Sequence, residues 1–206
     1  TGDILKPLTT GPGYNAEATL SSDGQRIVFT SHREGDLDIY TMNSDGGEVQ
    51  RLTHELGYDG WPFFSPDGQW IVYRAHHPTE PEAVTRYKEL LARELIEPMR
   101  MDLYLMRADG SEKRQITHLP GASFAPFFFP DGERIIFASN YQNPASSQFE
   151  LFAVNRNGQG LERITFSGGF NTFPMFSPDG KKLVFASNRN AQQPREINIF
   201  VADWVP

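Results

Sequence analysis

The sequence of 206 residues contains no cysteine. This absence excludes thiol nucleophiles, thiolate metal sites and disulfide bonds together. It fits an exported compartment such as the periplasm, although many cytosolic chains also lack cysteine. The chain also has no run of the ~18–20 apolar residues that a membrane-spanning helix requires. It begins at Thr1 without an initiator methionine or the apolar core of a signal peptide, so we expect a processed or trimmed chain.

Basic residues are outnumbered: 19 Lys and Arg stand against 26 Asp and Glu, which gives a net charge of −7. Because phosphate binding needs a clustered basic surface, we expect no nucleic-acid partner. Recognisable catalytic motifs are also missing, among them Gly-x-Ser-x-Gly, His-Glu-x-x-His and a phosphate-binding glycine-rich loop. The sequence therefore predicts a protein without enzyme activity, cofactor or metal site.

Phenylalanine (16), glycine (18) and proline (15) are abundant, as expected for many short strands joined by turns. Four segments align without gaps around an Asp-Gly pair. They are ATLSSDGQRIVFTSHR (18–33), PFFSPDGQWIVYRAHH (62–77), PFFFPDGERIIFASNY (126–141) and PMFSPDGKKLVFASNR (174–189). Proline presets the backbone, aspartate accepts hydrogen bonds within the turn, and glycine tolerates a positive φ. We interpret the four aspartates as structural turn residues.

Each of these segments is followed by a third apolar strand, at 38–43, 102–107, 150–155 and 198–203. Short closing strands are predicted at 49–53, 113–117 and 161–165. Such a repeat of about 45 residues predicts an all-β fold, a β-propeller with four four-stranded antiparallel blades. The units span about 14–53, 58–117, 122–165 and 170–206, and residues 4–9 are predicted to form the closing outer strand of a blade.

These units resemble the proline-aspartate (PD40, WD40-like) propeller repeat of the TolB-like family. The resemblance lies in PFFSPDG (62–68), the DIYTMN strand (38–43) and the RLT ending (51–53), and it covers essentially the whole chain. It implies a periplasmic or otherwise exported interaction module that binds a protein or peptide partner. Family members usually have six blades, so the resemblance implies that this chain is the C-terminal part of a longer protein. The alternative is a closed four-bladed ring. If the ring is open, the missing blades or another copy of the chain would cover its exposed edges.

The strand alternation places two columns of residues on the rim opposite the Asp-Gly turns. One column precedes the innermost strands and the other follows the second strands, and both surround the channel mouth, where propellers commonly bind ligands. Trp61 and Phe124 are predicted to edge the same channel. The predicted partner-binding residues are Asn15, His32, Asp59, Trp61, His76, Phe124, Asn140, Asn171 and Asn188. The alternative for the polar members is a turn or capping role within their own blades.

An insertion at residues 78–98 separates the second and third strands of the second unit. Thr79, with Pro81 and Glu82 in the first turn, predicts a capped helix over about 80–96. This helix would lie on the channel-mouth face, either packed on its own propeller or acting as a partner-binding lid.

Two other functions remain open at this stage. The chain could be the accessory propeller of a prolyl-oligopeptidase-like peptidase. It could also be a propeller that binds a small ligand or Ca²⁺, with Asp59 and Asn15 as oxygen donors.

Overall fold

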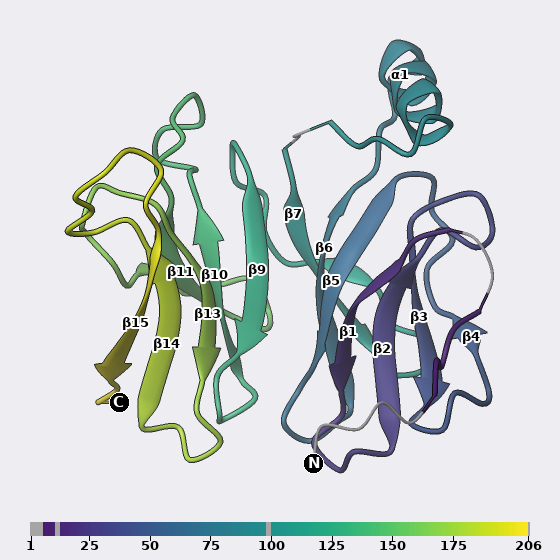
Figure 1. The fold of residues 1–206 in the computed structure, drawn as a ribbon, viewed down its shortest axis with the longest axis horizontal. Helices are drawn as coiled ribbons and strands as arrows, with labels where there is room; N and C mark the ends of the chain where they lie inside the picture. Colours follow the sequence, from purple (N-terminus) through teal and green to yellow (C-terminus); the bar gives the residue numbers. More distant parts are fainter. Residues whose placement is uncertain (1–5, 11–12, 98–99, 206) are drawn as a thin grey trace.

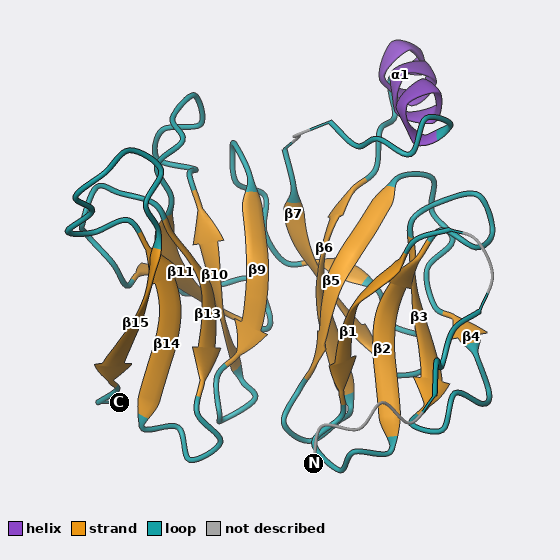
Figure 2. Cartoon of the chain, viewed as in Figure 1, coloured by secondary structure: helices purple, strands orange, loops and turns teal. Residues whose placement is uncertain are grey.

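The computed structural model describes residues 6–10, 13–97 and 100–205, which form four antiparallel sheets and one helix (Figures 1 and 2). We call the sheets blades 1 to 4. Blade 1 contains β1 (Asn15–Leu20), β2 (Arg26–Ser31), β3 (Asp38–Asn43) and β4 (Gln50–Arg51). Blade 2 contains β5 (Tyr58–Phe64), β6 (Trp70–His76), β7 (Asp102–Arg107) and β8 (Arg114–Gln115). Blade 3 contains β9 (Ser123–Phe128), β10 (Arg134–Ser139), β11 (Glu150–Asn155) and β12 (Glu162–Arg163). Blade 4 contains β13 (Asn171–Phe176), β14 (Lys182–Ser187) and β15 (Asn198–Asp203).

The predicted all-β propeller architecture is confirmed, with two corrections at the ends of the chain. Blade 4 has three strands in the described residues rather than four, because no segment after Asp203 pairs with β15. Of the closing strand predicted at 4–9, residues 4 and 5 lie outside the described residues. Residues 6–9 form no strand, since no third strand of another blade lies beside them in the described part of the chain.

The Asp-Gly turns owe their shape to serine and aspartate side chains. Ser21 Oγ donates a hydrogen bond to Asp23 Oδ1 at 2.6 Å, and the backbone N–H of Gln25 donates to the same oxygen at 3.0 Å. Gly24 follows with a φ of +70°, a conformation that other L-residues adopt at a cost. These contacts place Asp23 in the structural turn role predicted from the sequence.

The Leu-Thr ending of each closing strand also has a structural reason. Thr53 Oγ1 accepts a hydrogen bond from the backbone N–H of Ile39 at 2.9 Å and donates to Asp38 Oδ1 at 3.2 Å. Thr117 makes the equivalent contacts in blade 2, at 2.8 and 3.1 Å. In both blades, the hydrogen bonds of one threonine hydroxyl thus hold a closing strand of only two residues against the third strand.

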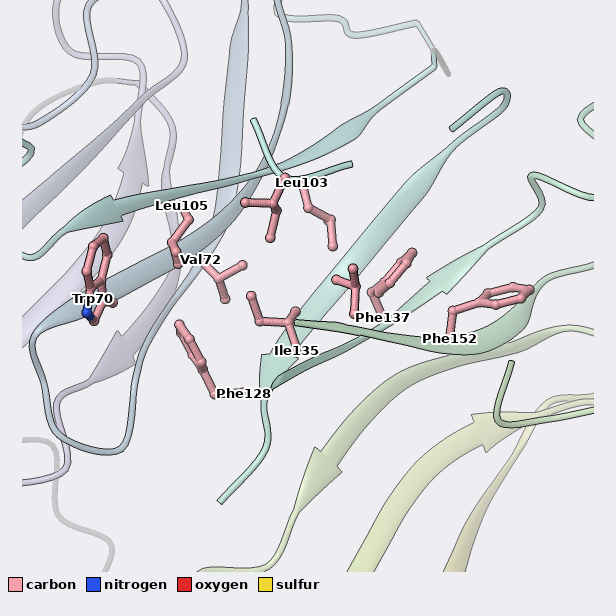
Figure 3. Close-up of a cluster of buried hydrophobic side chains, with 10 residues drawn as sticks. Trp70, Val72, Leu103, Leu105, Phe128, Ile135, Phe137 and Phe152 are labelled. Atoms are coloured by element: carbon pink, nitrogen blue, oxygen red, sulfur yellow. The ribbon is translucent and has the colours of Figure 1, made fainter. Parts of the chain in front are cut away.

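The blades pack face to face through apolar side chains. Figure 3 shows the core between blades 2 and 3, where Val72 and Leu105 meet Ile135 and Phe137, all fully buried. Consecutive blades contact through their inner strands, whereas among the described residues no strand of blade 1 contacts a strand of blade 4. The described blades therefore form an open arc, not a closed four-bladed ring.

The helix α1 (Pro81–Leu91) follows β6 and lies at the end of the blades opposite the Asp-Gly turns (Figure 1). It is shorter than the predicted 80–96, because the backbone at Glu94 adopts a positive φ of 57°. Its N-cap is Glu80 and not the predicted Thr79, and Pro81 occupies the first helical position. Tyr87 and Leu91 pack against the propeller, so the helix covers its own fold. No helix in the described part of the chain is long and apolar enough to cross a membrane.

Candidate binding face at the channel mouth

Each innermost strand carries a β-bulge whose central residue has a left-handed backbone. These residues are Glu17, Trp61, Ala125 and Phe173, with φ of 56°, 57°, 52° and 54°. A positive φ outside glycine costs on the order of 1–3 kcal/mol and is kept where the surrounding structure enforces it. A bulge re-aims the side chain that it carries. Of these residues only Trp61 was predicted for the site, because a hydrophobic pattern does not reveal a bulge.

Aromatic rings meet where these bulges converge. The Trp61 indole stacks on the Phe173 ring with centroids 5.2 Å apart, and Phe124 meets the edge of Phe173 at 6.1 Å. These rings come from blades 2, 3 and 4. The structure therefore brings together the predicted Trp61 and Phe124 and adds Phe173, whose side chain is 41% exposed.

An ion pair joins blades 1 and 2 beside this aromatic group. Glu17 accepts hydrogen bonds from the Trp61 backbone N–H and from Thr30 Oγ1, both at 2.8 Å. Arg74 Nη2 donates to Glu17 Oε1 at 3.3 Å and to the Tyr58 hydroxyl at 2.6 Å. The guanidinium lies over the rings of Tyr58 and Trp61, at 5.2 and 5.0 Å from their centroids. Neither Glu17 nor Arg74 was predicted from the sequence.

The predicted Asp59 is fully buried, and its Oδ1 lies 3.0 Å from His77 Nε2. Burial raises the pKa of Asp59. Burial alone would lower the pKa of His77, but the hydrogen bond and negative charge of Asp59 raise it on balance. In the aligned repeats His76, and not His77, occupies the predicted column. In this structure Asp59 is sequestered from solvent and bound to His77.

The asparagines that begin the inner strands are bound within their own blades through Oδ1, and Asn171 Nδ2 also donates to Glu150 Oε2 of blade 3 at 3.0 Å. Asn15 Oδ1 accepts hydrogen bonds from Ser31 Oγ at 2.9 Å and from Arg33 Nη2 at 3.0 Å. Asn171 Oδ1 makes the same pair of contacts with the equivalent serine and arginine of blade 4, both at 2.8 Å. These contacts correspond to the local role that the sequence left as an alternative.

The asparagines that follow the second strands hold loops. Asn140 Oδ1 accepts a hydrogen bond from the Ala122 backbone N–H at 2.8 Å. Asn188 Oδ1 accepts one from the Phe170 backbone N–H at 2.7 Å. Each amide thus ties the loop after a second strand to the segment that enters the first strand of the same blade.

Two cavities flank α1. A cavity of about 550 Å³ lies between blade 1, blade 2 and the C-terminal end of the helix, and the predicted His32 lines it together with Glu17 and Arg74. The predicted His76 lines a smaller cavity of about 140 Å³ against the helix itself. Burial lowers the pKa of His76. The channel-mouth face thus combines partly exposed aromatic rings, an inter-blade ion pair and a cavity beneath α1.

Antiparallel blades of three or four strands arranged around a common axis, with bulged inner strands, define this protein as a β-propeller. A family model described as the TolB beta propeller domain matches residues 1–88 and 88–203. The chain belongs to this family.

Two curated relatives illustrate the relation. A TolB homolog from Chlorobium luteolum is 30% identical over 146 residues, which cover 69% of this chain and 28% of the relative. The Tol-Pal system protein TolB of Bordetella pertussis is 38% identical over 48 residues, which cover 23% of this chain and 11% of the relative. The matched part of the chain thus spans less than a third of either relative.

The solved structure of TolB from Acinetobacter baumannii superposes with a TM-score of 0.75 at 20% identity. The match covers 98% of this chain and 44% of that one. Two peptidase structures also share the fold at 14% identity, with TM-scores of 0.59 and 0.64. Identities this low show the fold alone.

Proposed function

We propose that this propeller binds a protein or peptide partner at its channel-mouth face, in the periplasm, and that it does so without catalysing a reaction. The observation that carries the proposal is the aromatic group of Trp61, Phe124 and Phe173, held at the mouth by bulged inner strands. Rigid, partly exposed aromatic side chains are typical anchors of protein interfaces.

The family relation supports the same proposal. The Bordetella relative is named as a component of a Tol-Pal system, which implies an assembly of several proteins. The likeness to peptidase propellers rests on low identity and does not favour a hydrolase accessory role over binding.

The test is capture of a partner by the whole chain, followed by identification and a binding titration with the purified partner. The key variant carries Trp61→Ala and Phe173→Ala. Ala125 has a φ of 52° at the equivalent position of blade 3, so the bulge accepts alanine. We expect the variant to weaken the measured affinity by about thirtyfold or more, since interface anchors cost ~2 kcal/mol or more on truncation.

The matched control is Asn157→Ala, in a turn on the opposite rim that stays outside the proposed face. It should bind as the wild type does. If both variants bind the purified partner as tightly as the wild type, or if no partner can be titrated, the proposed function is wrong.

A further inference from the structure

Arg74 lines the larger of the two cavities that flank α1, and some of its hydrogen-bond donors are unused. A guanidinium carries five N–H donors. Nε donates to the Tyr58 hydroxyl at 3.1 Å, and Nη2 donates to Tyr58 at 2.6 Å and to Glu17 at 3.3 Å. The two donors on Nη1 have no acceptor among the described residues. The Arg74 side chain is 17% exposed and lines the cavity, so these donors remain for an incoming acceptor.

The carboxylate of Glu17, by contrast, has no free lone-pair site to accept a further hydrogen bond. Its Oε2 accepts from Thr30 Oγ1 and from the Trp61 backbone N–H, both at 2.8 Å. Its Oε1 accepts from Arg74 at 3.3 Å and from the Tyr58 hydroxyl at 3.4 Å. A carboxylate offers about four lone-pair sites, and all of them are used. The floor of the cavity therefore donates hydrogen bonds and does not accept them.

The charge of the floor selects among possible acceptors. The negative charge of Glu17 already balances the guanidinium of Arg74. Glu94, which is exposed, adds a second carboxylate to the cavity lining. An incoming carboxylate would therefore meet repulsion from Glu17 and Glu94 as well as attraction to Arg74. An uncharged acceptor such as a peptide carbonyl gains the hydrogen bond without that repulsion.

Much of the cavity wall is apolar. Leu37 and Leu91 are 4% and 8% exposed, Met101 and Ile96 are further apolar lining residues, and His32 and Tyr14 add polar groups. At about 550 Å³, the cavity is large enough for one bulky side chain with its flanking peptide groups. A hydrogen-bonding floor under largely apolar walls suits an apolar residue within a chain and not a charged chain end.

We propose that this cavity binds an internal peptide segment, with an apolar side chain against Leu37 and Leu91 and a backbone carbonyl oxygen accepting from Arg74 Nη1. The inference rests on the proposed function, because the segment belongs to the partner. In this inference, Arg74 selects a ligand whose hydrogen-bond acceptor is uncharged.

The experiment titrates the whole isotope-labelled chain by NMR with two small probes. The probes share the leucine side chain and the acetyl carbonyl and differ at the C-terminal group. N-acetyl-leucine N-methylamide ends in an uncharged amide carbonyl, and N-acetyl-leucine ends in a carboxylate. We expect the amide to bind at least about fivefold more tightly than the acid, with shifts at the residues that line the cavity. Glu17→Gln removes the repelling charge and should reverse or abolish this preference.

Arg74→Gln should weaken binding of the amide by about tenfold, the loss expected for a hydrogen bond from a charged donor. Because this variant leaves Glu17 without its ion pair and can unfold, a second variant, Ile96→Trp, fills the cavity and leaves the pair intact. It should also lose the amide. The control is Arg107→Gln, which removes an arginine stacked on Trp70, 4.0 Å from its ring centroid and outside the cavity.

Equal binding of acid and amide, tighter binding of the acid, or unchanged binding by Ile96→Trp overturns the inference. Those results leave partner capture untouched, so they are distinguishable from failure of the proposed function. If only the variant with Trp61→Ala and Phe173→Ala loses affinity for the partner, that result bears on the proposed function and not on the cavity.

Discussion

The Trp61 indole in blade 2 stacks on the Phe173 ring in blade 4, with centroids 5.2 Å apart and ring planes 23° apart. Both residues have a positive φ at the bulge of an innermost strand. The stack therefore joins two blades that are not consecutive in the chain, across the channel. It also gives the open arc a contact near its axis, in addition to the cores between neighbouring blades.

This stack should contribute measurable coupling to stability. In a double-mutant cycle with Trp61→Ala and Phe173→Ala, we expect a coupling energy of about 0.5–1.5 kcal/mol from denaturant unfolding, the range for aromatic pairs. Pairing Trp61→Ala with Phe185→Ala, whose ring instead stacks on Phe200, serves as the control and should be additive. Additivity in the first cycle would show that the stack does not tie the blades together.

The turn at Asp23 was predictable because its causes are local. The serine, the aspartate and the glycine that shape it lie within a few residues of one another, and their turn chemistry is general. The strand positions followed for a similar reason: the apolar runs between such turns repeat four times in one register. Local pattern and repetition together determine the propeller.

The bulges and the inter-blade ion pair were not predictable in the same way. Arg74 and Glu17 lie 57 residues apart and meet only because blades 1 and 2 pack together. Glu17 has a positive φ because the tertiary structure imposes it, although a glutamate residue disfavours this backbone conformation. For Asn15, a polar residue before a strand fits both a binding role and a local one, and only the contact with Ser31 showed its local partner.

The helix should depend on one hydrogen bond to blade 1. The Tyr87 hydroxyl donates to Asp36 Oδ1 at 2.5 Å, and both residues are buried. Tyr87→Phe removes a donor from a buried carboxylate, so we expect a loss of about 1–3 kcal/mol in unfolding free energy. Hydrogen exchange should also quicken in α1. Tyr141→Phe is the control, because within the described residues that hydroxyl accepts only an exposed hydrogen bond from Gln142 at 3.5 Å. Equal effects of both variants would contradict this role for Asp36.

Stability should fall as the pH rises through neutrality, owing in part to His77. Burial opposes protonation of His77, but the hydrogen bond and charge of Asp59, with further help from Glu55 and Asp36, raise its pKa above the usual 6.5. The folded state then binds a proton more tightly than the unfolded state does. This stabilisation is fully present below about pH 6.5 and is lost as the pH passes the folded-state pKa.

His77→Gln should therefore flatten the decline in unfolding free energy between about pH 6 and pH 9, measured by urea denaturation. A variant at His77 with an unchanged slope would show that the pair with Asp59 does not control the titration.

The outer face of blade 4 should drive association. Ile199 and Val201 on β15 are 74% and 69% exposed. Their equivalents in blade 3, Leu151 and Ala153, are 0% and 1% exposed because they pack against blade 4. Exposed apolar surface of this kind usually marks an interaction face. We therefore expect light scattering at micromolar concentration to show dimers or larger species for the 206-residue chain.

Replacing both residues with threonine should shift this chain toward the monomer, because threonine keeps the branched shape that suits a strand and lowers the apolar area. The matched control is Val49→Thr, at an apolar residue that is 44% exposed next to β4 in blade 1. It should leave the association constant unchanged. A wild-type chain that stays monomeric, or a threonine double variant that associates as strongly, would show that the exposed face of β15 is not the contact. In that case the first blade or the rings at the channel mouth become the surfaces to vary.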